Sequence, residues 1–275
     1  MNPAMPDQYA VIGNPVAHSK SPKIHAEFAR QTRQDLEYGR LLAPTHGFVS
    51  AASAFRAAGG RGLNVTLPFK EEAFAFATVL SQRARAARAV NTLKFEDNTI
   101  FGDNTDGTGL VNDLVRNLGR AVAGARVLLL GACGAARGVI APLLEQQPAQ
   151  LVLANRKLGK AQLLAEGFRG AIEASAYAGL AGRQFDIVVN ATSASLTGAL
   201  PPLPRGVFAR GALAYDMMYG MGETPFLAFA RGEGAAVLAD GMGMLVEQAA
   251  ESFYIWRGLR PDTASVLLLL RASNG

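Results

Sequence analysis

Lys70 stands where the local rules of helix formation disfavour a cation. A strand-like run at 63–67 meets Pro68, which fits the first position of the helix that follows. Lys70 then lies in the first helical turn, where the helix dipole favours acids such as Glu71 and Glu72. A residue set against its local rule is a candidate for chemistry, and an ammonium can transfer a proton or stabilise a developing negative charge. The alternative is a solvated lysine paired with Glu71 or Glu72.

A glycine-containing turn provides a second candidate site. Residues 131–138 read Gly-Ala-Cys-Gly-Ala-Ala-Arg-Gly, after an apolar strand at 126–130 and before a helical pattern at 135–145. Backbone N–H groups at such a helix N-terminus can hold a pyrophosphate. Cys133 occupies the place where a second glycine usually lets the phosphate approach. The alternative is a tight strand–helix turn without a ligand.

The next strand, at 151–154, ends in Asn155-Arg156-Lys157. A cofactor with a free ribose 2′-hydroxyl usually meets an acidic residue at this point, whereas adjacent cations suit a 2′-phosphate. We therefore predict NADP(H) rather than NAD as the cofactor. The alternative is that Arg156 and Lys157 are solvated residues at the start of the following helix.

Strand and helix patterns alternate along the chain, which predicts an α/β protein. The parallel sheet of the second half is expected because its strands are nearly continuous apolar runs. Helices near the C-terminus are expected to pack back on the first half, leaving a cleft between two domains. The predicted domains are 1–106 plus 240–275 and 107–239. The predicted strands are 9–13, 38–42, 63–67, 89–95, 99–101, 126–130, 151–154, 186–189 and 212–215, and the predicted helices are 21–31 (with Ser21 as N-cap), 45–58, 70–80, 110–118, 135–145, 244–256 and one from 261.

The composition narrows the class of protein. The 275 residues are 49% hydrophobic and 18% charged, with a formal net charge of +5. The basic residues are scattered, which argues against a nucleic-acid partner and fits anionic small ligands. The single cysteine, Cys133, excludes an intrachain disulfide framework and fits the cytoplasm. We expect no signal segment, no membrane span and no metal site, because the longest apolar runs are short and the three histidines lack ligand spacing.

Several motifs in order resemble those of the shikimate dehydrogenase family. The resemblance spans about residues 9 to 260. The motifs are Ile12-Gly13-Asn14-Pro15-Val16-Ala17-His18-Ser19-Lys20-Ser21-Pro22, Asn64-Val65-Thr66-Leu67-Pro68-Phe69-Lys70, Ala89-Val90-Asn91-Thr92, Gly102-Asp103-Asn104-Thr105-Asp106-Gly107, Asn190-Ala191-Thr192-Ser193, Asp216-Met217-Met218-Tyr219, Thr224-Pro225-Phe226-Leu227 and Asp240-Gly241-Met242-Gly243-Met244-Leu245.

The resemblance implies reversible reduction of 3-dehydroshikimate to shikimate with NADPH, in a monomer or homodimer. It implies a split substrate domain, a central Rossmann-like NADP domain, and Lys70 with Asp106 as the catalytic pair. The residues that it implies for substrate binding are Ser19, Ser21, Asn64, Thr66, Asn91, Asp106, Tyr219 and Gln248. The predicted cofactor residues are Gly131, Ala132, Cys133, Gly134, Ala135, Asn155, Arg156, Lys157, Thr192, Met217 and Gly241.

Some features leave alternatives open. Ser21 and Asp106 could simply cap helices. Cys133 and the pair Ala194-Ser195 stand where the family commonly has glycine, and Lys157 where it often has threonine. The rival functions are a relative that also oxidises quinate, with broader cofactor use, and a non-catalytic protein that binds shikimate or NADP.

Overall fold

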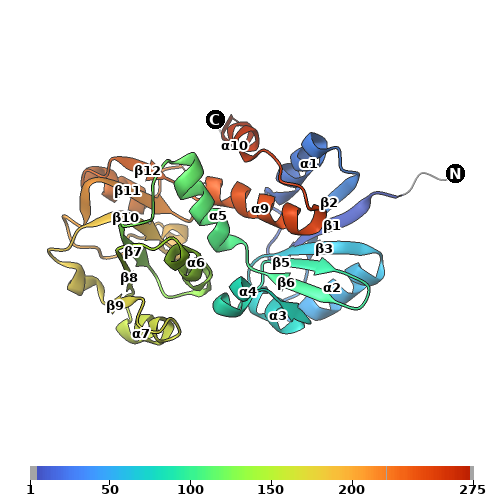
Figure 1. Cartoon of the computed structure of the whole chain (residues 1–275), viewed down its shortest axis with the longest axis horizontal. Helices are drawn as coiled ribbons and strands as arrows, with labels where there is room; N and C mark the ends of the chain where they lie inside the picture. The colour runs from blue at the N-terminus through green and yellow to red at the C-terminus, as the bar shows by residue number, and fades with distance from the viewer. Residues whose placement is uncertain (1–4, 221, 273–275) are drawn as a thin grey trace. The chain divides into compact units, whose positions relative to one another are not determined.

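The computed structural model describes residues 5–220 and 222–272. The chain forms two compact units, unit 1 (residues 1–109 and 246–275) and unit 2 (residues 110–245). Each unit is built on a six-stranded sheet (Figure 1).

The sheet of unit 1 is mixed, with the strand order β2-β1-β3-β5-β6-β4. Strand β1 runs parallel to β2 and β3, whereas β5 runs antiparallel to both β3 and β6. The turn residues Glu96-Asp97-Asn98, between the predicted strands 89–95 and 99–101, indicate the connection from β5 to β6. The strands are β1 (Asp7–Gly13), β2 (Leu36–Leu42), β3 (Gly60–Val65), β4 (Val79–Leu80), β5 (Thr92–Phe95) and β6 (Ile100–Asp103).

Helices cover both faces of this sheet. Along β1 the side chains alternate, so Ala10 and Ile12 enter the apolar core formed with α2, α3 and α4. Tyr9 points to the other face, where its ring lies 4.6 Å from that of Trp256 at the end of α9. The helices of unit 1 are α1 (Ser21–Thr32), α2 (Phe48–Ala57), α3 (Lys70–Phe76), α4 (Gln82–Ala87), the greater part of α9 (Met242–Arg257), and α10 (Thr263–Ala272).

The sheet of unit 2 is entirely parallel, with the strand order β12-β11-β10-β7-β8-β9. This is the strand order of a doubly wound dinucleotide-binding sheet. From β7 the chain first adds β8 and β9 on one side and then returns to add β10, β11 and β12 on the other side, so the strand order reverses between β7 and β10. Ligands of such sheets bind beyond the carboxyl ends of the strands at that reversal. The strands are β7 (Arg126–Leu130), β8 (Gln150–Ala154), β9 (Glu173–Ser175), β10 (Phe185–Asn190), β11 (Phe208–Asp216) and β12 (Val237–Ala239).

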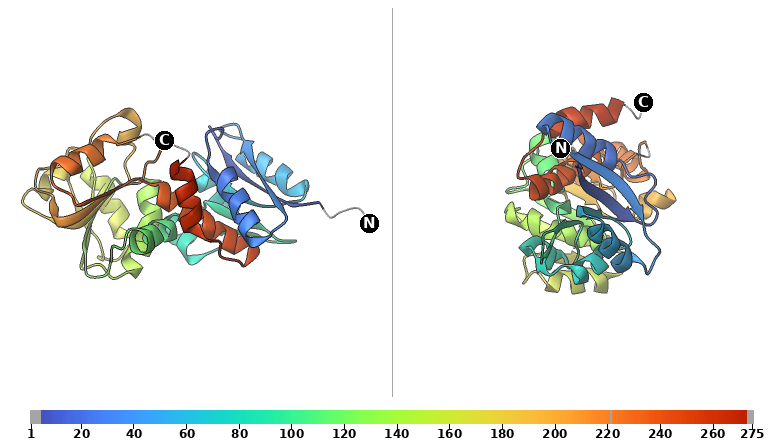
Figure 2. Two further views of the ribbon diagram at one scale, coloured as in Figure 1. Left: turned by 90° about the horizontal axis from the view of Figure 1, so that it is seen from above. Right: turned by 90° about the vertical axis from the view of Figure 1, so that its right-hand side faces the viewer.

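The two faces of this sheet carry separate apolar cores, as the alternation along β7 shows. Val127 and Leu129 pack with α5, α6 and α7, whereas Leu128 and Leu130 pack with α8. Figure 2 gives two further views of these layers. The helices are α5 (Asp106–Asn112), which continues as the π-helix η1 (Asp113–Asn117), then α6 (Gly134–Glu145), α7 (Leu158–Glu166), α8 (Pro225–Gly232) and the short 3-10 turns η2 (Tyr177–Leu180) and η3 (Ala194–Thr197).

The α/β class, the parallel second sheet and the packing of the C-terminal helices on the first sheet are as predicted. The predicted domain boundaries, at 106/107 and 239/240, stay predictions, and the ends of those ranges, 1–4 and 273–275, lie outside the described residues. Two helix starts were predicted wrongly. Pro68 does not open α3, because Lys70 is its first residue and Phe69 its N-cap. Ser21 is not an N-cap, because α1 begins at Ser21 and Lys20 is the N-cap residue.

Two helix lengths also differ from prediction. The pattern at 70–80 breaks at Phe76, because Val79 and Leu80 pair with β6 as strand β4. The helix expected from 110 begins four residues earlier, at Asp106, so that Asp106 belongs to its first turn. In both places a tertiary contact decides what local periodicity alone does not.

Candidate active site

Lys70 and Asp106 form an ion pair in unit 1. The Lys70 ammonium lies 2.6 Å from the Asp106 carboxylate, and the two side chains are 27% and 12% exposed. Each residue opens a helix, α3 for Lys70 and α5 for Asp106. The backbone carbonyl of Lys70 accepts from the N–H of Val90, which fixes the start of α3 against the neighbouring segment. Lys70 therefore pairs with Asp106, and not with Glu71 or Glu72 as the alternative required.

Asn91 orients the Asp106 carboxylate. The backbone N–H of Thr105 donates to Asn91 Oδ1 over 2.9 Å, which assigns the orientation of the amide. Asn91 Nδ2 then lies 2.8 Å from Asp106 Oδ1 and 3.2 Å from Gln248 Oε1. Asn91 is 3% exposed, so these contacts are shielded from water. The fold thus brings two further predicted substrate residues, Asn91 and Gln248, to the Lys70–Asp106 pair, although they lie 157 residues apart along the chain.

A second group of predicted residues surrounds Asn64. Asn64 Oδ1 accepts from the Tyr38 hydroxyl over 2.7 Å, and Asn64 Nδ2 donates to Ser252 Oγ over 2.9 Å. The Ser21 side chain adjoins the same Tyr38 hydroxyl. Ser19 Oγ accepts from the N–H of Ser21 over 3.3 Å, at the first residue of α1.

Ser252 and Thr105 join the two groups. Thr105 Oγ1 lies 3.3 Å from Ser252 Oγ and 2.9 Å from Asn91 Nδ2. Hydrogen bonds therefore connect Asn64 to the Lys70–Asp106 pair through side chains that are nearly all buried. Tyr38, Thr105 and Ser252 were not predicted as site residues. A polar run at 103–106 was the only signal for Thr105, and nothing local marked the other two.

The remaining predicted substrate residues lie in separate places. Thr66 follows β3. Its methyl group lies 2.4 Å from where a Cβ on Gly13 would stand, so the close contact between the two segments requires glycine at position 13. Tyr219 belongs to unit 2, in the loop after β11, and burial raises the pKa of its phenol.

The residues behind Asn64 form an aromatic layer that holds Tyr38 in place. The His25 ring stacks on Tyr38 with centroids 4.2 Å apart and planes 7° apart. Burial lowers the pKa of His25 to about 3 and raises the pKa of Tyr38 well above its usual value. Both side chains are consequently neutral near pH 7, and the Tyr38 hydroxyl keeps the proton that it donates to Asn64.

The glycine turn of unit 2 leads directly from β7 into α6. Gly131 has a φ of +99°, and a Cβ there would lie 3.0 Å from Thr192 Cγ2. Cys133 precedes α6 as its N-cap residue, is exposed, and directs Sγ to the carbonyl of Ala191 at 3.2 Å. A Cβ at Gly134 would meet nothing within 4 Å, so space is open beside the first residue of α6. These features fit a dinucleotide phosphate at this turn.

Arg156 and Lys157 follow the carboxyl end of β8 and are both exposed. Neither forms a salt bridge with any residue in the described ranges. Asn155 donates to the carbonyl of Lys157 over 2.9 Å and so fixes the bend that presents the two cations. This segment fits an adenosine ribose that carries a 2′-phosphate.

Three other predicted cofactor residues follow strands β10, β11 and β12. Thr192 donates to Asn190 Oδ1 over 2.7 Å. The carbonyl of Met217 lies 2.2 Å from where a Cβ on Gly241 would stand, so this crossing requires glycine. Together with the turn after β7, these residues lie at the carboxyl ends of parallel strands, where this fold binds ligands.

Ser195 explains the unusual sequence after Thr192. Its hydroxyl donates to Asp216 over 2.7 Å, and Thr224 donates to the same carboxylate oxygen over 2.6 Å. The other Asp216 oxygen accepts from the backbone N–H of Met218. Asp216 is 0% exposed, so these donors satisfy a buried charge at the end of β11. Ser195 thus ties the loop after β10 to the loop after β11.

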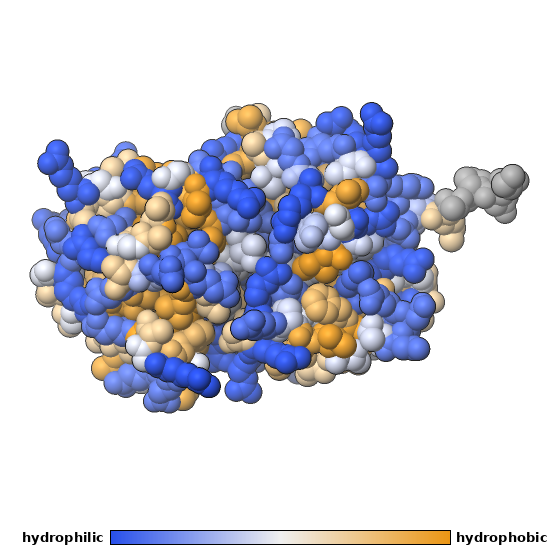
Figure 3. All heavy atoms as spheres, viewed as in Figure 1, coloured by the Kyte–Doolittle hydropathy of each residue, from blue (hydrophilic) through white to orange (hydrophobic). Residues whose placement is uncertain are grey.

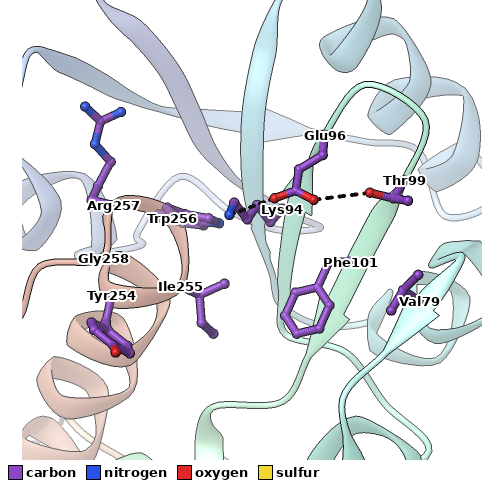
Figure 4. A pocket seen from close by; sticks show the side chains of 10 residues that line it. All are labelled: Val79, Lys94, Glu96, Thr99, Phe101, Tyr254, Ile255, Trp256, Arg257 and Gly258. Carbon is purple, nitrogen blue, oxygen red and sulfur yellow. Dashed lines mark hydrogen bonds and ion pairs between the residues drawn. The ribbon is translucent and has the colours of Figure 1, made fainter.

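A groove in unit 1 lies apart from these residues. It has a volume of about 790 Å³ and runs between the end of α9 and the β5–β6 hairpin (Figure 4). In its wall the Glu96 carboxylate pairs with Lys94 and accepts a hydrogen bond from Thr99. In Figure 3 hydrophobic side chains gather over the same hairpin. None of the predicted site residues lines this groove, so its size does not make it the reaction centre.

Two features define an NADP-dependent oxidoreductase. Unit 2 has a parallel sheet with a glycine turn and a bend that carries two cations. Unit 1 has a lysine–carboxylate pair beside many short polar side chains. Comparisons with known proteins give the same class. Residues 11–93 match the shikimate dehydrogenase substrate binding domain, residues 113–197 match shikimate / quinate 5-dehydrogenase, and residues 241–267 match the shikimate 5′-dehydrogenase C-terminal domain.

Individual relatives extend over nearly the whole chain. The shikimate dehydrogenase (NADP(+)) of Aromatoleum aromaticum is 62% identical over 96% of this chain and 97% of its own length. The crystal structure of an Ael1 enzyme from Pseudomonas putida has 52% identity and a TM-score of 0.92, covering 96% of this chain and 98% of that one. Shikimate 5-dehydrogenase of Thermus thermophilus, crystallised with NADP(H) and shikimate, has 32% identity and a TM-score of 0.87, covering 97% and 99%. The chain belongs to the NADP-dependent shikimate dehydrogenase family.

Proposed function

We propose that this chain catalyses the reversible reduction of 3-dehydroshikimate to shikimate with NADPH. The observation that carries the proposal is the Lys70–Asp106 pair, 2.6 Å apart, next to the buried side chains of Asn91 and Thr105. A substrate with several hydroxyl groups needs such short donors and acceptors. Family membership at 62% identity supports the same reaction.

Lys70 supplies the proton in the reduction. When bound, NADPH provides the hydride that enters the ketone carbon of 3-dehydroshikimate. As negative charge develops on the ketone oxygen, the Lys70 ammonium stabilises it and donates a proton to it. Asp106 accepts a hydrogen bond from one of the three N–H groups of the ammonium, which leaves the other two to point at the substrate.

The substrate is held by the polar network of unit 1. In this proposal Asn91, which holds Asp106, and Gln248, which accepts from Asn91, contact ring hydroxyls. Asn64 and Thr66 contact the rest of the ring. Ser19 and Ser21 bind the carboxylate, and Tyr219 is the remaining substrate residue of the proposal. Residues 1–106 with 240–275 then form the substrate domain.

The cofactor is held by unit 2, the NADP domain in this proposal (residues 107–239). The N–H groups of the turn after β7, residues 131–135, bind the pyrophosphate. Asn155, Arg156 and Lys157 bind the adenosine ribose and its 2′-phosphate. Thr192, Met217 and Gly241 contact the nicotinamide half.

The location and assembly of the enzyme are also proposals. A single exposed cysteine suits the reducing cytoplasm. Among the described residues no helix is long and apolar enough to cross a membrane. We propose a monomer or a homodimer, which light scattering of the purified chain would distinguish.

The test is a two-by-two assay of cofactor reduction by the purified chain, followed by absorbance. Shikimate or quinate is combined with NADP or NAD. The proposal predicts fast turnover with shikimate and NADP only. Comparable turnover with quinate or NAD would indicate a relative of broader specificity, and binding of both ligands without turnover would indicate a non-catalytic protein.

A further inference from the structure

We propose that Arg83 is a positioning residue for this reaction, because it fastens the helical turn that carries Asp106 to the helix that carries Gln248. The inference rests on the proposed function, in which both of these residues contact the substrate. Arg83 lies in α4 and none of the motifs that identified the family includes it.

The Arg83 guanidinium contacts three elements at once. Nε and Nη2 donate to the Asp103 carboxylate at the end of β6. Nη1 donates to Thr108 Oγ1 over 2.7 Å, in the first turn of α5. Nη1 and Nη2 also lie 3.1 Å and 3.2 Å from Glu251 Oε1 on α9. The guanidinium spreads five N–H donors over a wide, rigid fork, whereas the three donors of a lysine all sit on one nitrogen at the end of a flexible stem.

These contacts are shielded from water. The Asp103 and Glu251 side chains are 3% and 8% exposed, and that of Arg83 is 26% exposed. Arg260 provides a second cation for Glu251, at 2.8 Å, and Ser81 donates to Asp103. Two buried carboxylates are therefore balanced by two guanidiniums, and the geometry of the cluster is fixed by many bonds.

The cluster is adjacent to the reacting groups along the chain. Thr108 follows Asp106 by two residues in the same turn, and Glu251 follows Gln248 by three residues, one helical turn along α9. Asn91 holds the carboxylate of Asp106, but Arg83 holds the backbone turn from which it projects. Because misplacement by about 1 Å can cost on the order of a hundredfold in rate, this turn must be fixed.

The test begins with Thr108, because Arg83→Ala would take one partner from each of two buried carboxylates and destabilise the fold. Thr108→Val removes only the hydroxyl that joins the guanidinium to α5, and Thr108→Ser keeps it. Arg83→Lys keeps the charge and loses the fork. Arg85→Ala, at an exposed position of the same helix, is the control.

We expect Thr108→Val and Arg83→Lys to lower kcat/KM for shikimate at least tenfold, with KM for NADP unchanged. Thr108→Ser and Arg85→Ala should match the wild type, and the thermal midpoints of the two Thr108 variants should agree. A merely structural role would lower the midpoint and leave the kinetics of the folded fraction unaltered.

Wild-type kinetics in both Thr108→Val and Arg83→Lys would overturn the role of Arg83, and so would an equal loss in Thr108→Ser. In those cases the wild-type chain still turns over shikimate, and the proposed function stands. A wild-type chain that cannot reduce NADP with shikimate would overturn the proposed function, and the role of Arg83 with it.

Discussion

His25 should make the stability of unit 1 depend on pH in a predictable way. The side chain is 0% exposed, so its ring is shielded from water. Desolvation by burial lowers its pKa from 6.5 to about 3 in the folded chain. Below pH 6.5 the unfolded chain takes up a proton on His25 that the folded chain does not, so the unfolded state gains stability.

The size of the effect follows from the two pKa values. Stability due to neutral His25 is fully present above pH 6.5 and is lost progressively as the pH falls toward 3. Each pKa unit corresponds to about 1.4 kcal/mol, so lowering the pH from about 8 to about 5 should cost about 2 kcal/mol. His25→Phe keeps the ring stacked on Tyr38 and removes the titration.

The assay is urea unfolding of the wild type and His25→Phe at both pH values. Trp256 is the only tryptophan and its ring lies 5.2 Å from that of His25, so its fluorescence reports the unit in question. The titration of carboxylates changes the unfolding free energy of the wild type and of the variant equally, so it cancels when the two chains are compared. We expect the loss of unfolding free energy at the lower pH to be about 2 kcal/mol smaller in the variant. An equal loss in both chains would refute the reasoning from burial.

Three further predictions concern the site. Asp106→Asn should lower kcat about a hundredfold, since it removes the carboxylate that aims Lys70, while KM for NADP stays the same; an unchanged kcat in steady-state assays would refute it. Arg156→Ala should weaken NADP binding about tenfold or more and leave NAD binding unaltered, because it removes a charge-assisted bond to the 2′-phosphate. Calorimetric titration with each cofactor measures the ratio of the two affinities. An equal loss of affinity for both cofactors would contradict the prediction. Alkylation of Cys133 should lower NADP affinity, since its thiol lies in the phosphate turn and contacts Ala191; unchanged affinity after complete modification would exclude this.

Several elements could be predicted because their signal is local. The strand at 126–130 is a continuous apolar run with one register in a parallel sheet, and the structure has it at the same residues. Helix α6 begins within one residue of its predicted start because a glycine turn precedes it. The antiparallel pair β5 and β6 followed from turn residues between two short apolar segments.

Other features depended on contacts that local patterns do not contain. The end of α3 is decided by the pairing of Val79 and Leu80 with β6. Asn64 was predicted as a site residue, but its partners are Tyr38, 26 residues earlier, and Ser252, 188 residues later. The place of Ser195 became clear only from Asp216, whose buried charge needs donors from two loops. Partners so distant in sequence leave no periodic signal.

The central claim is that Lys70 transfers a proton during shikimate oxidation and 3-dehydroshikimate reduction, and one kinetic comparison tests it most directly. The comparison measures NADP reduction with saturating shikimate by the wild type and by Lys70→Met, which keeps the length of the side chain and removes the ammonium. The account predicts a kcat at least about a hundredfold lower in the variant, with shikimate and NADP still bound. A Lys70→Met chain that turns over at the wild-type rate would contradict it.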